Sequence, residues 1–330
     1  MAGFSEIIGH EQIIENLKNA ICYEKISHAY IFNGPDLSGK KMLAEAFAMA
    51  LQCEKEQSFG CMECHSCKQA ISHNHPDIIY VSHEKPNTIG VDDIRTQVNS
   101  DIGIKPYSSK YKIYIIDEAE KMNPQAQNAL LKTIEEPPSY GILMLLTTNA
   151  DGFLQTILSR CITLNLRGVK TEVIKKHLMT HYQKPDYLAD ICATFSQGNV
   201  GKAIQLASSE EFNVLKAAVL TLLKKTEELD VADISVTARE LSEYKPQIDE
   251  YLDLMTMWFR DVLYYKAAED VNNLIYKDEV FDIKKQAAKR SYYGIEEILG
   301  QIQTARTRIK ANVNFELTME LLLLAIKENK

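Results

Sequence analysis

Ile113-Tyr114-Ile115-Ile116-Asp117-Glu118 is the stretch that decides the fold of this chain. Its first four residues are apolar and three of them are β-branched, which is typical of a strand buried on both faces of a parallel sheet. Two carboxylates then end the strand. Because the C-terminal ends of the strands line the ligand crevice of a doubly wound sheet, Asp117 and Glu118 are predicted to face a bound ligand.

A helix and a second strand are predicted to follow. Asn123 and Pro124 are favourable residues for a helix start, a helical apolar repeat continues to Ile134, and the prolines at 137–138 stop it. Residues 142–146 are apolar and end in a polar stretch at 147–149. Together these segments predict one strand–helix–strand unit of a nucleotide-binding α/β domain.

The same alternation occurs elsewhere in the first half of the chain. A buried strand is predicted at 29–32, further strands at 78–81 and 162–166, and helices at 41–52 and 91–99. The α/β pattern ends near residue 167. Residues 169–207 are predicted to form a small helical region, and residues 211 to the end are helical with almost no strand pattern.

Composition restricts the class of protein. The chain has 330 residues, a formal net charge of −8 and a pI near 5.6, which argues against binding nucleic acid over its whole surface. No apolar run approaches the roughly 20 residues that cross a bilayer, and the N-terminus lacks a basic region followed by an apolar one. We expect a soluble, cytoplasmic protein of two or three domains.

A glycine-rich loop follows the strand at 29–32. The pattern G-x-x-x-x-G-K matches at Gly34, Gly39 and Lys40, with Ser38 inside it, so the loop is predicted to hold phosphates. The next residue should be Ser or Thr, whose hydroxyl binds Mg²⁺, but it is Lys41. Phosphate binding without efficient hydrolysis is therefore the favoured interpretation. The alternative is a glycine turn that binds nothing.

The paired acids have a role only if a metal is present. Asp117 would orient Mg²⁺ through water and Glu118 would polarise the attacking water, while Asn149 or Thr148 would position that water. In the alternative interpretation the two acids cap the following helix, and Asn149 is a turn residue at the end of its strand.

Four of the seven cysteines form the pattern Cys53-x7-Cys61-x2-Cys64-x2-Cys67. Four thiolates complete a tetrahedron around Zn²⁺ and leave no open position, so a structural zinc module is predicted at 53–67. The alternatives are an iron–sulfur cluster, or replacement of one thiolate by His65, His73 or His75. Cys22, Cys161 and Cys192 are separate and are predicted to be packed as small apolar residues.

Ser159-Arg160-Cys161 precedes the last predicted strand. An arginine on such a loop can reach a γ-phosphate bound by a neighbouring subunit and stabilise transition-state charge. The alternative is a local ion pair with a carboxylate, which is the usual outcome for a single arginine.

These motifs resemble the clamp-loader branch of the AAA+ ATPases, in particular subunits of bacterial DNA polymerase III. The likeness extends over the whole chain, and its most specific part is Leu130-Leu131-Lys132-Thr133-Ile134-Glu135-Glu136-Pro137-Pro138 beside an Asp-Glu strand. The resemblance implies a RecA-like P-loop domain at 1–167 that contains the zinc module, a helical lid at 168–208 and an all-α collar for oligomerisation at 209–330.

The resemblance also implies a function. Members of the family form a pentameric ring with delta and gamma/tau subunits, which uses ATP to load the sliding clamp onto primed DNA. In that setting Arg160 would act as an arginine finger in trans. Lys202 occupies the position where the lid often presents a nucleotide-sensing arginine. Lys41 and Lys202 both indicate a subunit with weak or absent ATPase activity, whether or not ATP or ADP is bound.

Two other hypotheses remain from the sequence. The first is an active motor ATPase of the gamma/tau type, which should carry Ser or Thr after Lys40. The second is an independent nucleotide-binding module or kinase, which would need a set of substrate residues that the chain does not offer.

Overall fold

The computed structural model describes residues 3–55, 58–83, 85–226 and 229–329. The chain forms two compact units. The first comprises Met1–Ile174 together with Ser196–Lys202, and the second comprises Lys175–Phe195 together with Ala203–Lys330. The division into domains at 1–167, 168–208 and 209–330 stays a prediction.

A parallel sheet of five strands is the centre of the first unit. Its spatial order is β2-β3-β4-β1-β5, and every neighbouring pair is parallel. The bounds are β1 Ala29–Asn33, β2 Ile78–Val81, β3 Lys112–Ile116, β4 Gly141–Thr147 and β5 Ile162–Asn165. All five predicted strands are confirmed to within a residue or two at their ends. All five residues of β3 are buried, as expected for a strand covered on both faces.

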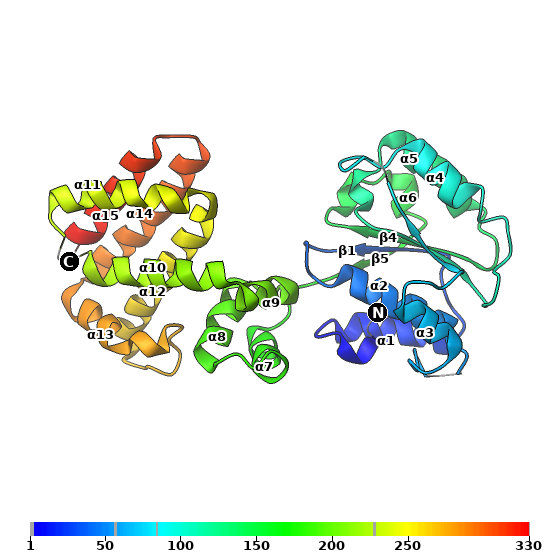
Figure 1. The fold of residues 1–330 in the computed structure, drawn as a ribbon, viewed down its shortest axis with the longest axis horizontal. Coiled ribbons are helices and arrows are strands. Elements are labelled where there is room, and N and C mark those ends of the chain that lie inside the picture. Colours follow the sequence, from blue (N-terminus) through cyan, green and yellow to red (C-terminus); the bar gives the residue numbers. More distant parts are fainter. Residues whose placement is uncertain (1–2, 56–57, 84, 227–228, 330) are drawn as a thin grey trace. The chain divides into compact units, whose positions relative to one another are not determined.

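Side chains alternate between two cores because successive strand residues point to opposite faces. Ile113 and Ile115 belong to one core, and Tyr114 and Ile116 belong to the other. Helices cover both faces of the sheet (Figure 1). On the first face lie α1 Glu11–Cys22, α2 Lys40–Gln52 and α3 His65–Ile71; on the second lie α4 Val91–Ile94, α5 Pro124–Glu135 and α6 Gln155–Leu158.

Local chemistry explains the helix that follows β3. The Asn123 side chain accepts a hydrogen bond from the backbone N–H of Ala126, so Asn123 is the N-cap that the sequence predicts. Leu130 and Ile134 are buried against the sheet. The helix ends at Glu135, and Glu136 separates it from the two prolines. The helix predicted at 91–99 is an α-helix only to Ile94 and continues as a π-helical turn over Arg95–Asn99. Short 3-10 turns lie at η1 Phe4–Glu6, η3 Ala119–Lys121 and η4 Ala150–Gly152.

The described part of the second unit is helical, as the sequence predicts. Trp258, Phe259 and Val262 on α12 are fully buried and belong to its core. No helix among the described residues is long and apolar enough to cross a membrane. The helices are α7 Thr171–His181, α8 Asp186–Phe195, α9 Val200–Ser208, α10 Glu210–Lys225, α11 Val231–Glu240, η5 Leu241–Gln247, α12 Ile248–Ala268, η6 Lys277–Glu279, α13 Val280–Lys289, α14 Tyr292–Lys310 and α15 Phe315–Glu328, of which α7 and α9 begin in the first unit.

One cysteine prediction is wrong. Cys22 is exposed rather than packed, because it is the last residue of α1 and lies on the solvent side of that helix. Cys192 is buried and Cys161 is partly buried against the sheet. Burial raises the pKa of the thiol to about 12 for Cys161 and to about 11 for Cys192, so both remain protonated at neutral pH.

Candidate nucleotide and metal sites

The C-terminal ends of the strands gather the predicted nucleotide residues at one edge of the sheet. Hydrogen bonds join the strand ends directly. The backbone N–H of Gly34 donates to the Thr147 carbonyl over 3.1 Å, and the Asn33 side-chain amide donates to Asn165 Oδ1 over 2.8 Å. Asn33 also accepts from the backbone N–H of Ala150. The sequence pattern did not single out Asn33, although its place at the end of the strand before the glycine loop could have indicated it.

The glycine loop occupies residues 34–39 between β1 and α2. Gly39 has φ +92, a left-handed conformation that favours glycine at the start of the helix. The Ser38 hydroxyl is buried and has no hydrogen-bond partner among the described residues. A buried hydroxyl without a partner is costly, so this atom is suited to a ligand oxygen.

Lys40 lies folded over its own loop. Its Nζ donates to the carbonyl oxygens of Gly34 at 2.7 Å and Pro35 at 2.9 Å, and Asp36 lies 3.8 Å away. Its side chain is only 10% exposed. The ammonium therefore has the position expected of a P-loop lysine, but loop carbonyls take the place of phosphate oxygens.

Lys41 is paired with the first acid of the central strand. Its Nζ lies 3.3 Å from Asp117 Oδ2, and the two side chains are 56% and 43% exposed. The positions at which a P-loop ATPase places its two metal-binding groups are thus bonded to each other.

Glu118 is directed to a different set of partners. It has φ +51 and caps the 3-10 turn η3, and its carboxylate lies 2.7 Å from Lys121 Nζ and 3.5 Å from His83 Nε2. The hydrogen bond from Lys121, aided by His83, holds the pKa of this carboxyl below its usual range despite partial burial. The structure therefore separates Glu118 from the Lys41–Asp117 pair. The neighbouring Glu120, which the sequence pattern left out, accepts bonds from the backbone N–H and the hydroxyl of Thr148.

Asn149 has the turn role that the sequence analysis gave as its alternative. Its side-chain oxygen accepts from the backbone N–H of Asp151 and caps η4. This bond occupies one acceptor of the amide. A role in positioning water stays a prediction.

A turn at residues 196–202 contacts the glycine loop within the first unit. The Asn199 side-chain amide donates to the Asp36 carbonyl over 2.6 Å, and the backbone N–H of Gly201 donates to the Leu37 carbonyl over 3.2 Å. A Cβ on residue 201 would lie 2.4 Å from the Leu37 oxygen, so this contact requires glycine. The backbone N–H of Lys202 donates to Asn199 Oδ1, which places Lys202 in the first turn of α9 beside the loop.

A cavity of about 680 Å³ lies beside the glycine loop, between the start of α1 and the segment after β5. His10 lines it and is joined to the loop by a contact of 3.3 Å between its Nε2 and the Ser38 carbonyl. Burial lowers the pKa of His10, although the Ser38 carbonyl and Glu11 act to raise it. Volumes of this order are typical of small-molecule sites.

Arg160 follows α6 and lies next to the end of α5. Its guanidinium is 3.2 Å from Glu135 Oε1 and donates to the Thr156 carbonyl at 3.1 Å. The Arg160 and Glu135 side chains are 40% and 47% exposed. The local ion pair that the sequence analysis named as the alternative is therefore present, in a position open to solvent.

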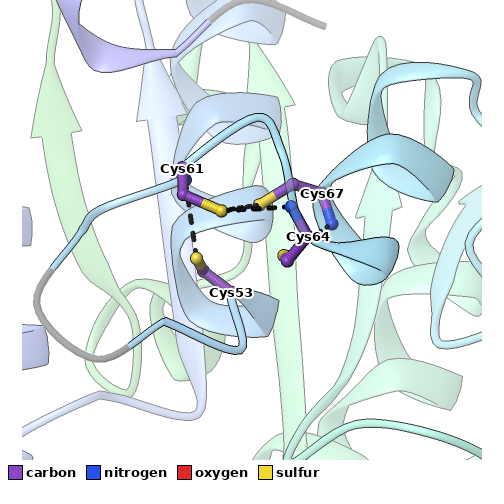
Figure 2. Close-up of side chains that lie close together, drawn as sticks. All are labelled: Cys53, Cys61, Cys64 and Cys67. Atoms are coloured by element: carbon purple, nitrogen blue, oxygen red, sulfur yellow. Dashed lines mark hydrogen bonds between the residues drawn. The ribbon is translucent and has the colours of Figure 1, made fainter.

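The four cysteines of the predicted zinc module converge (Figure 2). Cys53 directly follows the last residue of α2, the next two lie on the following loop, and Cys67 is in the first turn of α3. Their four sulfur atoms all lie within 4.8 Å of one another, and no histidine belongs to the cluster among the described residues. His75 instead contacts the hydroxyls of Ser66 and Ser109, at 3.0 and 3.2 Å.

Backbone N–H groups point at the sulfur atoms of the cluster. Cys61 N–H donates to Cys53 Sγ, Cys64 N–H to Cys61 Sγ, and Cys67 N–H to Cys64 Sγ, over 3.5, 3.3 and 3.3 Å. Burial acts to raise the pKa of Cys53, but hydrogen bonds led by that of Ser58 lower it to about 6. Backbone hydrogen bonds, that of Cys64 first, lower the pKa of Cys61, whereas burial raises that of Cys67. The loop therefore favours the thiolate, the form that binds metal, at Cys53 and Cys61.

Comparison with known proteins gives consistent matches. A family model described as DNA polymerase III, delta subunit, matches residues 9–170, and one described as DNA polymerase III, delta subunit, C terminal, matches residues 210–328. The chain is 28% identical to DNA polymerase III subunit delta' of Bacillus subtilis over 321 residues, which is 96% of each chain. It is 31% identical to subunit tau of the same organism over 324 residues, but spans only 57% of tau.

Among solved structures, a DNA polymerase III gamma subunit-related protein from Thermotoga maritima is 20% identical, with a TM-score of 0.45. The alignment covers 96% of this chain and 99% of that one.

Proposed function

The chain belongs to the family of DNA polymerase III delta-prime subunits, and from this premise we propose that it is a clamp-loader subunit that hydrolyses no ATP itself. It acts in DNA replication by completing the assembly that loads the sliding clamp onto primed DNA. Its contribution to catalysis is Arg160, inserted into the ATP site of a neighbouring subunit. The strand order, with the glycine loop after β1 and the acids after β3, supports a RecA-like AAA+ domain.

The ion pair between Lys41 and Asp117 carries this proposal. In an active P-loop ATPase a Ser or Thr hydroxyl and an Asp carboxylate hold Mg²⁺ between them. Here an ammonium lies 3.3 Å from the carboxylate and neutralises it. An ammonium has no lone pair to offer a metal and repels one at short range. The residues present therefore do not fit the catalytic Mg²⁺ site.

The glycine loop retains groups that can bind phosphate. The Ser38 hydroxyl has no hydrogen-bond partner in the part of the chain that the structure describes. Lys40 lies at the loop, although it must leave the Gly34 and Pro35 carbonyls to meet a phosphate. The cavity beside His10 is large enough for a nucleoside. We propose that ATP or ADP bound here, with Lys202 near the phosphates, serves as a structural ligand that is not turned over.

Arg160 can exchange Glu135 for a phosphate on a neighbouring subunit because its present contacts are weak. An ion pair between two side chains that are both roughly half exposed contributes on the order of 0.2–1 kcal/mol. A γ-phosphate offers the guanidinium a stronger, bidentate partner. In the assembled loader Arg160 leaves Glu135 and stabilises charge that develops on the neighbour's ATP.

The cysteine cluster fits one structural zinc ion. Four sulfurs around Zn²⁺ at about 2.3 Å lie about 3.8 Å from one another, close to the arrangement in this loop. In an iron–sulfur cluster the four thiolates are distributed over two or four irons, which spreads the sulfurs further apart. Cys53, Cys61, Cys64 and Cys67 would hold the ion and fix the loop between α2 and α3; no part of the ATP chemistry involves it.

The proposed partners are the other loader subunits, delta and gamma/tau, in a pentameric ring. The helical second unit is proposed to supply the collar that joins them, with the clamp and primed DNA reached through the complex. Reconstitution tests this function: clamp loading by the purified partner subunits should depend on this chain. Loading at full rate without it would contradict the proposal. An active motor of the gamma/tau type is the second candidate, and the Lys41–Asp117 pair disfavours it.

A further inference from the structure

The outward face of α13 differs in charge from the rest of this acidic chain. Its exposed positions are Phe281, Lys284, Lys285, Ala288 and Lys289, and none of them is acidic. The opposite side of the helix is buried, and α13 packs on α12 (orange and yellow in Figure 1). The overall net charge is −8, so a helix face with three lysines and no carboxylate is a local exception.

Three exposed aromatic residues lie on α13 or at the start of the next helix. Phe281 is 79% exposed, and Tyr292 and Tyr293 at the start of α14 are 53% and 73% exposed. Two rings already lie against cations: Lys284 Nζ is 5.3 Å from the centre of the Tyr265 ring, and Lys266 Nζ is 5.3 Å from that of Tyr292. We refer to Phe281, Lys284, Lys285, Tyr292 and Tyr293 as the α13 face.

Two nearby carboxylates have other partners. Asp282 and Glu279 both pair with Lys224 on α10. The first exposed carboxylate along α14 is Glu296, one turn beyond Tyr292. Lys284 and Lys285 therefore present positive charge to solvent, together with open aromatic rings.

We propose that the α13 face binds single-stranded nucleic acid. Lysines neutralise backbone phosphates, and exposed rings stack on bases whatever their identity. A duplex would leave the rings unused because its bases are already stacked on one another. A protein partner is disfavoured because lysine is depleted from the centres of protein interfaces, whereas here it fills three of the five exposed positions of the helix. This site goes beyond the proposed function.

The test is fluorescence anisotropy with the full chain and a labelled oligothymidylate of about 20 nucleotides, over roughly 50 to 200 mM salt. Lys284→Gln with Lys285→Gln should weaken binding and reduce the slope of log K against log salt concentration by about 1.4, since each phosphate contact contributes about 0.7. Phe281→Ala with Tyr293→Ala should weaken binding at least about fivefold with the slope retained.

The matched control is Lys25→Gln with Lys176→Gln, which removes the same charge at exposed positions elsewhere. It should leave binding unchanged. The proposal is overturned if the wild-type chain does not bind at the lowest salt, if the control weakens binding as much, or if the aromatic pair has no effect. Tighter binding of a duplex or of an acidic peptide would also overturn it. None of these substitutions touches Arg160, Lys41 or the glycine loop, so failure here is distinct from failure of the clamp-loader proposal.

Discussion

Replacing Lys41 by threonine should give this chain a response to magnesium. In the native chain the Lys41 ammonium lies 3.3 Å from Asp117, where the metal of an ATPase would be held. Lys41→Thr removes that positive charge, frees Asp117 and supplies the missing hydroxyl. We therefore expect ATP affinity to be insensitive to Mg²⁺, or reduced by it, in the native chain, and to be increased by Mg²⁺ in the variant.

The magnitude follows from the distances. Mg²⁺ binds its oxygen ligands at about 2.0–2.1 Å, so an ion bound near Asp117 would lie within about 4 Å of the Lys41 ammonium. Repulsion between charges of +2 and +1 at about 4 Å is about 2 kcal/mol even in bulk water, and larger in a partly buried site. This corresponds to a change of at least about 30-fold in the affinity for Mg²⁺-ATP. The fold should tolerate the change, because a half-exposed ion pair contributes no more than about 1 kcal/mol.

The assay is isothermal titration of the isolated chain with a non-hydrolysable ATP analogue, with and without Mg²⁺. Lys41→Met is the control, because it removes the charge without adding a metal ligand. This variant should show part of the increase in Mg²⁺-ATP affinity that is expected for Lys41→Thr. The reasoning is refuted if native chain and threonine variant bind Mg²⁺-ATP with equal affinity.

Three further predictions concern other parts of the chain. The purified protein should contain one zinc per chain and lack the visible absorption of an iron–sulfur cluster. Cys64→Ser should lose the metal and lower the thermal midpoint of the first unit, and full stability without metal would contradict a structural role. Glu135→Gln should release Arg160 and speed the loader's ATP turnover by no more than about fivefold, since the pair is worth up to about 1 kcal/mol, whereas the matched Glu136→Gln should change nothing. Burial raises the pKa of Asp261 to about 6, although its carboxylate accepts hydrogen bonds from the backbone N–H groups of Ile275 and Tyr276. Because the pKa of this carboxyl is higher in the folded state than in the unfolded state, its contribution to stability falls as pH rises from about 4 to 6. In urea unfolding, the free energy of unfolding of Asp261→Asn should therefore rise relative to that of the wild type by on the order of 2–3 kcal/mol across this pH window. A difference in unfolding free energy that does not depend on pH would show that the carboxyl does not titrate there.

The fold was largely predictable because its central strands, β3 and β4, are buried along their whole length. A continuous apolar run such as 113–116 has no polar position that a helix or loop would need, and Asn123 and Pro124 mark the helix start chemically. The less regular parts were not predictable. The π-helical turn at Arg95–Asn99 has the same apolar spacing as an α-helix, and the exposure of Cys22 depends on where α1 ends.

The candidate site was predictable as a set of residues but not as a set of contacts. Spacing placed Lys41 and Asp117 at the same sheet edge, yet their direct pairing depends on side-chain positions that no motif encodes. The same holds for the bond between Lys40 and its own loop and for the pair of Arg160 with Glu135. The contact of Gly201 with Leu37 joins segments over 160 residues apart, and only the folded chain reveals it.

The most direct test of the central claim is ATP turnover by the reconstituted loader with Arg160→Ala in this chain. A trans arginine contributes roughly 10³ to 10⁵ to the rate at the site that receives it, about 4–7 kcal/mol of transition-state stabilisation. The account predicts that turnover at the neighbouring site collapses and clamp loading slows, while ATP binding and assembly of the loader are retained. Arg160→Lys should restore little of the lost ATP turnover, because an ammonium lacks the bidentate geometry of a guanidinium. Unchanged turnover and loading with Arg160→Ala would contradict the account.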